Sequence, residues 1–132
     1  MTESPIAQPA QPRKIFWGDD VPADWNGTWP ADLLTVPERT KWTRTVSTLQ
    51  LHEWIAALKL TTEFLHVETM FLSPLRKAAP VMVLANPRVT TPAEARASGK
   101  PVVFLLGNIH PPESEAAEAM LMLGRDLAAG KC

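Results

Sequence analysis

Residues 101–119 read PVVFLLGNIHPPESEAAEA, and the fold predicted for this chain is built around them. Its first six residues, 101–106, form a continuous apolar run between Gly99 and Gly107, as expected for a strand buried on both faces of a sheet. Helical periodicity follows from about Glu113 to Ala129. A buried strand followed directly by a helix is half of an α/β unit, in which ligands bind beyond the carboxyl end of the strand.

The expected C-terminal helix has a clear inner face and a clear end. Gly130 is expected to stop it, because glycine readily adopts the left-handed conformation that ends a helix. Four apolar side chains recur at helical spacing and are expected to face the core: Ala117, Met120, Leu121 and Leu127.

Upstream, the pattern predicts a helix and a hairpin. Ser47 and Gln50 have the spacing of a capping box, which predicts an amphipathic helix over residues 47–62. Alternating apolar and polar residues predict a strand over residues 64–71, and residues 81–84 predict a second strand that forms a hairpin with it. A short helical turn is expected around residues 93–97.

Composition limits the domain organisation and the partners. The 132 residues carry a formal net charge of -1, so a broad basic surface for nucleic acid is not expected. The longest apolar runs are far shorter than the roughly 20 residues of a membrane span, and the first 11 residues lack the pattern of a signal peptide. We expect a disordered leader over residues 1–14, an irregular Trp- and Pro-rich arm over 15–46, and one α/β domain over 47–132. The tryptophans of the arm are expected to pack on the core.

His110 and Glu113 lie three residues apart between the expected strand and helix. An imidazole nitrogen and a carboxylate oxygen are both ligands of Zn²⁺, whose catalytic sites have three protein ligands and a water. The residues alone leave a second interpretation open. Glu113 would then stabilise the helix N-terminus through the helix dipole, and His110 would bond to the loop backbone. The other histidines, His52 and His66, are interpreted as surface or strand residues.

The segment GNIHPPESEAAEA, residues 107–119, resembles the first zinc-ligand motif of the carboxypeptidase A-like zinc carboxypeptidases. The order of helix, two strands and buried third strand extends the resemblance over roughly residues 47–131. Ser73 and Arg76 depart from the family's usual form, because no glycine precedes the arginine, and they receive no role.

The resemblance implies that His110 and Glu113 bind zinc, Glu113 through both oxygens, and that the substrate is a peptide or protein hydrolysed at its C-terminal bond. It implies the leading part of a three-layer α/β/α metallopeptidase domain with a mixed sheet. The family's second histidine ligand, arginine pair and glutamate base are not found after Glu113, so this chain is expected to be inactive alone and to self-associate through open sheet edges. A secreted or periplasmic location is common in the family.

Two other functions remain open. Zinc deacylases of the aspartoacylase type place His and Glu at the same spacing, usually with Gly and Asn between them, where this chain has Pro111 and Pro112. A non-catalytic binding module would instead use the Trp-rich arm as its contact surface, and His110 and Glu113 would then be structural.

Overall fold

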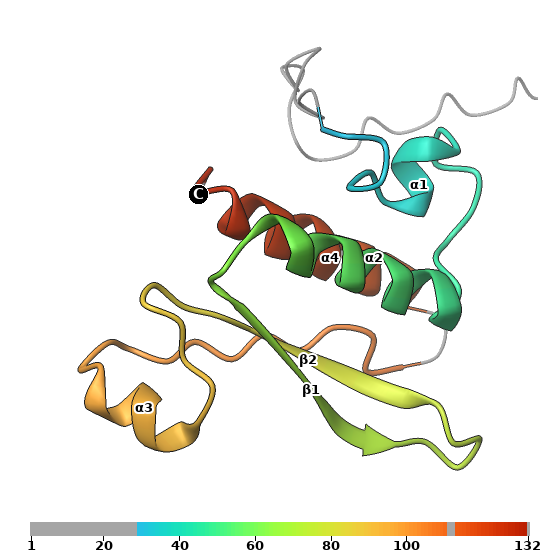
Figure 1. The fold of residues 1–132 in the computed structure, drawn as a ribbon. Helices are drawn as coiled ribbons and strands as arrows, with labels where there is room; N and C mark the ends of the chain where they lie inside the picture. Colours follow the sequence, from blue (N-terminus) through green and yellow to red (C-terminus); the bar gives the residue numbers. More distant parts are fainter. Residues whose placement is uncertain (1–28, 111–112, 132) are drawn as a thin grey trace, which may run out of the picture.

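The computed structural model describes residues 29–110 and 113–131 (Figure 1). The expected leader and the first half of the arm, with Trp17 and Trp25, lie outside this range. In Figure 1, two longer helices, α2 (Thr48–Thr61) and α4 (Ser114–Ala128), lie together on one side of a two-stranded antiparallel hairpin, β1 (Leu65–Leu72) and β2 (Ala78–Leu84). The short helices are α1 (Val36–Arg39) and α3 (Pro92–Ala97). The fold is therefore mixed α and β, as predicted.

Helix α2 forms where the capping pattern predicted it. The Gln50 backbone N–H donates to Ser47 Oγ at 3.3 Å, and the Ser47 N–H donates to Gln50 Oε1 at 3.0 Å. These two bonds satisfy backbone donors that the first turn of a helix otherwise leaves unpaired. The helix buries Trp54, Ile55 and Leu58.

The predicted hairpin is also confirmed. Leu65 pairs with Leu84 at one end and Leu72 with Ala78 at the other, with a register shift between Thr69 and Phe71. Only the first part of β1 reaches the core, because Leu65 is buried whereas the strand is exposed from Glu68 onward. The predicted apolar face therefore continues beyond the core into solvent.

The predicted third strand is wrong. Within the described residues the sheet has two strands, and residues 101–106 form neither a strand nor a helix. Their side chains are exposed, with fractions of 77% for Val103 and 53% for Leu105. A continuous apolar run forms a buried strand only when strands flank it and layers cover it. The described part of the chain provides one hairpin and one pair of longer helices, which do not enclose this run.

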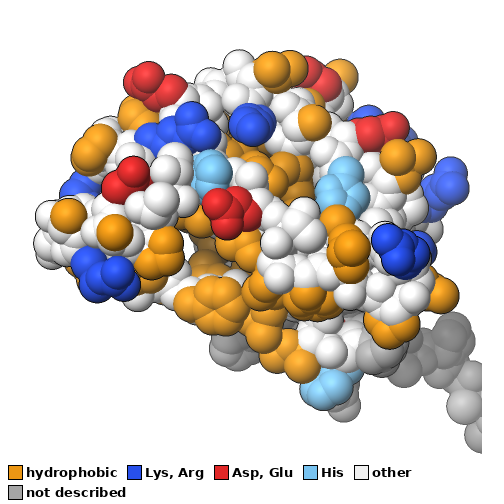
Figure 2. All heavy atoms as spheres, turned by 60° about the horizontal axis from the view of Figure 1, so that its bottom comes forward, with side chains coloured by type: hydrophobic (Ala, Val, Ile, Leu, Met, Phe, Trp, Pro, Cys, Tyr) orange, Lys and Arg blue, Asp and Glu red, His pale blue; other side chains and the backbone are white. Residues whose placement is uncertain are grey.

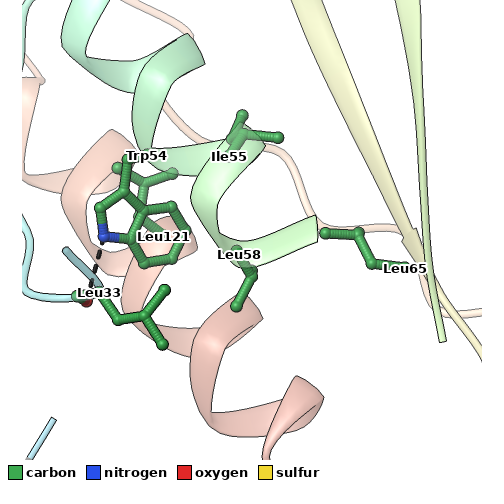
Figure 3. Packing of buried hydrophobic residues seen from close by; sticks show 6 residues of the cluster. All are labelled: Leu33, Trp54, Ile55, Leu58, Leu65 and Leu121. Atoms are coloured by element: carbon green, nitrogen blue, oxygen red, sulfur yellow. Dashed lines mark hydrogen bonds between the residues drawn. The ribbon is translucent and has the colours of Figure 1, made fainter. Parts of the chain in front are cut away.

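The core lies between the helices and the base of the hairpin (Figure 3). It is formed by one buried cluster that draws on four segments of the chain: Leu33, Trp54, Ile55, Leu58, Leu65 and Leu121. Trp54 Nε1–H donates to the Leu33 carbonyl at 3.1 Å, shown dashed in Figure 3, so the buried indole is also satisfied as a donor. On α4, a Cβ added at Gly124 would lie 3.1 Å from Met82 Cε, which shows how closely α4 approaches β2.

The described part of the arm is more regular than predicted. Helix α1 lies within it, and the Thr35 backbone N–H donates to the Glu38 carboxylate at 2.7 Å. Trp29 packs against the core cluster, as predicted, under Arg125 and Lys131 at 4.5 and 3.7 Å from its ring centroid. Trp42 differs, since it is 56% exposed.

Helices α3 and α4 agree with the predicted segments. Thr91 caps α3 by accepting from the Glu94 backbone N–H at 3.2 Å. Helix α4 ends as predicted at Gly130, whose φ is +67°, and the Lys131 N–H reaches back to the Asp126 carbonyl. The prediction that Leu127 faces the core is wrong, because Leu127 is 44% exposed. The prediction for Leu121 is confirmed, because that residue is buried.

Candidate functional site

The loop that carries His110 and Glu113 is held against the start of α4. A Cβ added at Gly107 would lie 2.9 Å from the Ala116 carbonyl oxygen and 3.0 Å from Met120 Cγ, so only glycine allows the loop to approach the helix this closely. Asn108 follows in the left-handed conformation with φ of +60°, which asparagine tolerates better than most residues. These two residues turn the chain toward α4 just before His110.

His110 and Glu113 face each other. His110 Nδ1 lies 2.5 Å from Glu113 Oε1, and the His110 backbone N–H donates to Glu113 Oε2 at 3.2 Å. Both side chains are accessible, with exposed fractions of 71% and 41%. The hydrogen bonds from the His110 side chain and backbone lower the pKa of Glu113 below its ordinary value of 4.5. The carboxylate is therefore ionised at neutral pH and fixes the orientation of the ring.

This arrangement differs from the helix-dipole interpretation in one respect. Glu113 occupies the N-cap position of α4 but makes no side-chain hydrogen bond to the first turn of the helix. Its carboxylate oxygens turn back to His110 instead. The sequence-predicted pair is thus brought together in space, and it is not used to cap the helix.

The pair offers zinc two ligands of suitable chemistry. Zinc binds imidazole nitrogen at about 2.0–2.1 Å and carboxylate oxygen at about 2.0–2.2 Å. An ion bonded to Nδ1 and Oε1 would replace the present hydrogen bond between them, so metal binding competes with the proton they share. Among residues 29–110 and 113–131, no three His, Cys, Asp or Glu side chains gather where they could hold one metal ion. A complete three-ligand site needs a donor from outside this loop.

The other two histidines lie elsewhere. His66 Nε2 is 2.8 Å from Glu68 Oε1, and Arg88 Nη2 lies 3.3 Å from His66 Nδ1. Because the arginine can only donate, Nδ1 accepts and the Nε2–H donates to Glu68. His52 Nε2 donates to the Ala78 carbonyl at 3.2 Å and so joins α2 to the start of β2. His66 and Glu68 thus form a second histidine–carboxylate contact, which can be compared with the contact between His110 and Glu113.

Helix α4 also carries two buried charged side chains that were not predicted from the sequence. Glu118 and Arg125 are 4% and 3% exposed, and they lie on the same face of the helix as Leu121. Glu118 Oε1 accepts from the Val46 backbone N–H at 2.6 Å, and Arg125 bonds to Glu38 and to the Leu33 carbonyl. Their burial could have been predicted from helical spacing. Glu118 lies three residues before Leu121 and Arg125 lies four residues after it, so both face inward with that leucine.

Glu118 also lines a pocket between α4 and the arm. The pocket has a volume of about 220 Å³, and Trp42 and Met122 form part of its wall. Glu118 Oε2 has no hydrogen-bond partner, yet it is enclosed by protein atoms. Burial raises the pKa of Glu118 above 4.5, against the opposing effect of the Val46 N–H. Glu118 and the Val46 N–H join α4 to the arm, and no ligand is assigned to this pocket.

No family model, curated protein or solved structure matches this chain. The carboxypeptidase resemblance of residues 107–119 therefore stays a prediction. No helix in the described ranges is long and apolar enough to cross a bilayer.

Proposed function

We propose that this chain is the leading part of a zinc-dependent metallocarboxypeptidase, with His110 and Glu113 as two of the three protein ligands. The observation that carries the proposal is the 2.5 Å approach of His110 Nδ1 to Glu113 Oε1. Both side chains are accessible, and they lie directly before α4. The proposed domain has the three-layer α/β/α architecture that the resemblance implies.

The chain's own groups support cation binding at this loop. The lowered pKa of Glu113 keeps the carboxylate charged, and its contact with Nδ1 fixes that nitrogen as the one aimed at a shared ligand. A bound zinc ion lowers the pKa of its water and polarises a scissile carbonyl. A third ligand and a general base do not join His110 and Glu113 among the described residues, so we assign no turnover to the 132 residues alone.

Calorimetric titration of zinc into the full chain tests the proposal. We expect weak binding with a stoichiometry of one, because two protein ligands leave the ion held mostly by water. His110→Ala and Glu113→Ala should each abolish it. His66→Ala is the matched control, since His66 has its own carboxylate partner at a similar distance, and His52→Ala is a second control.

Two outcomes of the zinc titration would overturn the proposal. Zinc binding that survives His110→Ala and is lost in His66→Ala would assign the metal to the β1 pair and overturn the proposal. The absence of any heat of binding at millimolar zinc would overturn it as well.

A further inference from the structure

The exposed apolar strip, residues 102–106, is the most unusual surface of the described chain. All five side chains are more than half exposed: Val102, Val103, Phe104, Leu105 and Leu106. Contiguous apolar surface of this kind on a folded protein marks an interaction site more often than scattered apolar residues do. The face turned forward in Figure 2 shows hydrophobic side chains gathered around a hollow in the surface.

The backbone of the strip is also unpaired. Across the described residues, the structure gives its N–H and C=O groups no hydrogen-bond partner. From Lys100 to Leu106 the chain runs without a turn or bend, and in Figure 1 it is part of the orange trace that passes behind the hairpin. An extended backbone with free donors and acceptors is a template for pairing with another strand.

We infer that the strip pairs with the same strip of a second copy of this chain, in antiparallel orientation. A two-fold axis brings a surface against itself, and antiparallel pairing of identical segments has that symmetry. With the axis at Phe104, the phenyl rings of the two copies face each other. Val103 then lies opposite Leu105 of the second copy, and Val102 opposite its Leu106.

The charge of the strip permits a second copy as its partner, and its size sets how strongly the two copies bind. Residues 101–109 contain no charged side chain, so pairing two copies brings no like charges together. The apolar area of the strip is on the order of 500 Å², below the roughly 800 Å² that each partner buries in a standard interface. We therefore expect the dimer to be weak, as complexes with interfaces at the small end of the range tend to be.

Sedimentation velocity of the full chain from about 5 μM to 1 mM tests the inference, with Cys132→Ser in every variant to remove the single thiol. The mass should rise from 14.5 kDa toward a plateau at twice that value. Leu105→Lys should weaken association at least tenfold. Leu60→Lys is the matched control, because Leu60 is an 89% exposed leucine on α2, and it should dimerise like the parent.

Disulfide trapping tests the register. In the Cys132→Ser background, Phe104→Cys places two cysteines directly opposite each other, at the Cα separation that a disulfide requires. It should form a covalent dimer at least tenfold faster than Val103→Cys, which faces position 105, or Leu60→Cys. A monomer at 1 mM, growth beyond the dimer without a plateau, equal association of the two lysine variants, or equal trapping rates would each overturn the inference. None of these measurements depends on zinc.

Discussion

Arg125 and Glu38 form a bidentate ion pair between residues 87 positions apart in the chain, with Nη1–Oε2 and Nη2–Oε1 distances of 2.8 and 3.0 Å. Their side chains are 4% and 2% exposed. The same guanidinium donates to the Leu33 carbonyl at 3.0 Å and lies over the Trp29 ring. Arg125 of α4 thus contacts three residues of the arm, and these contacts hold the arm against the helix.

Glu38→Gln should lower the free energy of unfolding at pH 7 by about 3 kcal/mol, because removing one partner leaves a buried guanidinium without its counter-charge. Glu53→Gln, at an exposed position on α2, should change it by less than about 0.5 kcal/mol. Urea denaturation of both variants measures the difference. Equal stability of the two variants would show that the pair contributes nothing to the fold.

The two buried carboxylates should impose opposite pH dependences. Burial raises the pKa of Glu38, but hydrogen bonds from Arg125 and Thr35 and the charge of Arg125 outweigh it, so the folded pKa lies below 4.5. Its contribution to stability is present above pH 4.5 and is lost as the pH falls through the folded pKa. Burial and the nearby Glu38 charge place the folded pKa of Glu118 above 4.5, so its contribution is present below pH 4.5 and is lost as the pH rises.

Urea denaturation from pH 3.5 to 7 checks these signs. The stability cost of Glu38→Gln should shrink toward pH 3.5. Glu118→Gln keeps an oxygen that can accept from the Val46 N–H, and it should gain stability relative to the parent as the pH rises above 4.5. A Glu118→Gln profile parallel to that of the parent would contradict the burial effect on this carboxyl.

Leu58→Ala should destabilise the core by about 2–5 kcal/mol, because Leu58 is only 1% exposed within the central cluster and its removal leaves a cavity. Leu60→Ala on the same helix removes an 89% exposed leucine and should stay within about 0.5 kcal/mol of the parent. Thermal and urea denaturation of this pair separates burial from helix propensity, since the substitution is identical. Similar losses of stability in both variants would show that Leu58 does not lie in the core.

Gly107→Ala should push the loop of His110 away from α4, because the added Cβ would lie 2.9 Å from the backbone oxygen of Ala116. We expect a stability loss of about 1–3 kcal/mol, as for other overpacked sites, and zinc affinity at least threefold lower. Gly99→Ala is not a usable control, since Gly99 has a positive φ. Ala119→Gly, on α4, controls for a generally weakened helix, and it should leave zinc binding unchanged.

The local helices and strands of this protein follow from short sequence patterns. The Ser47 and Gln50 capping pair fixed the start of α2, the alternation around Leu65 fixed β1, and Gly130 fixed the end of α4, because each of these signals acts over a few neighbouring residues. The proximity of His110 and Glu113 followed in the same way, from a spacing of three residues.

The extent to which these elements are buried depends on contacts between distant segments of the chain. The apolar run at residues 101–106 carried the pattern of a core strand, yet it is exposed because burial depends on neighbours that no local pattern supplies. Conversely, Glu118 and Arg125 carried charges typical of a surface, and they are buried because Val46, Glu38 and Leu33 provide their partners across the chain. Partners from distant segments of the chain therefore determined whether these apolar and charged side chains are buried.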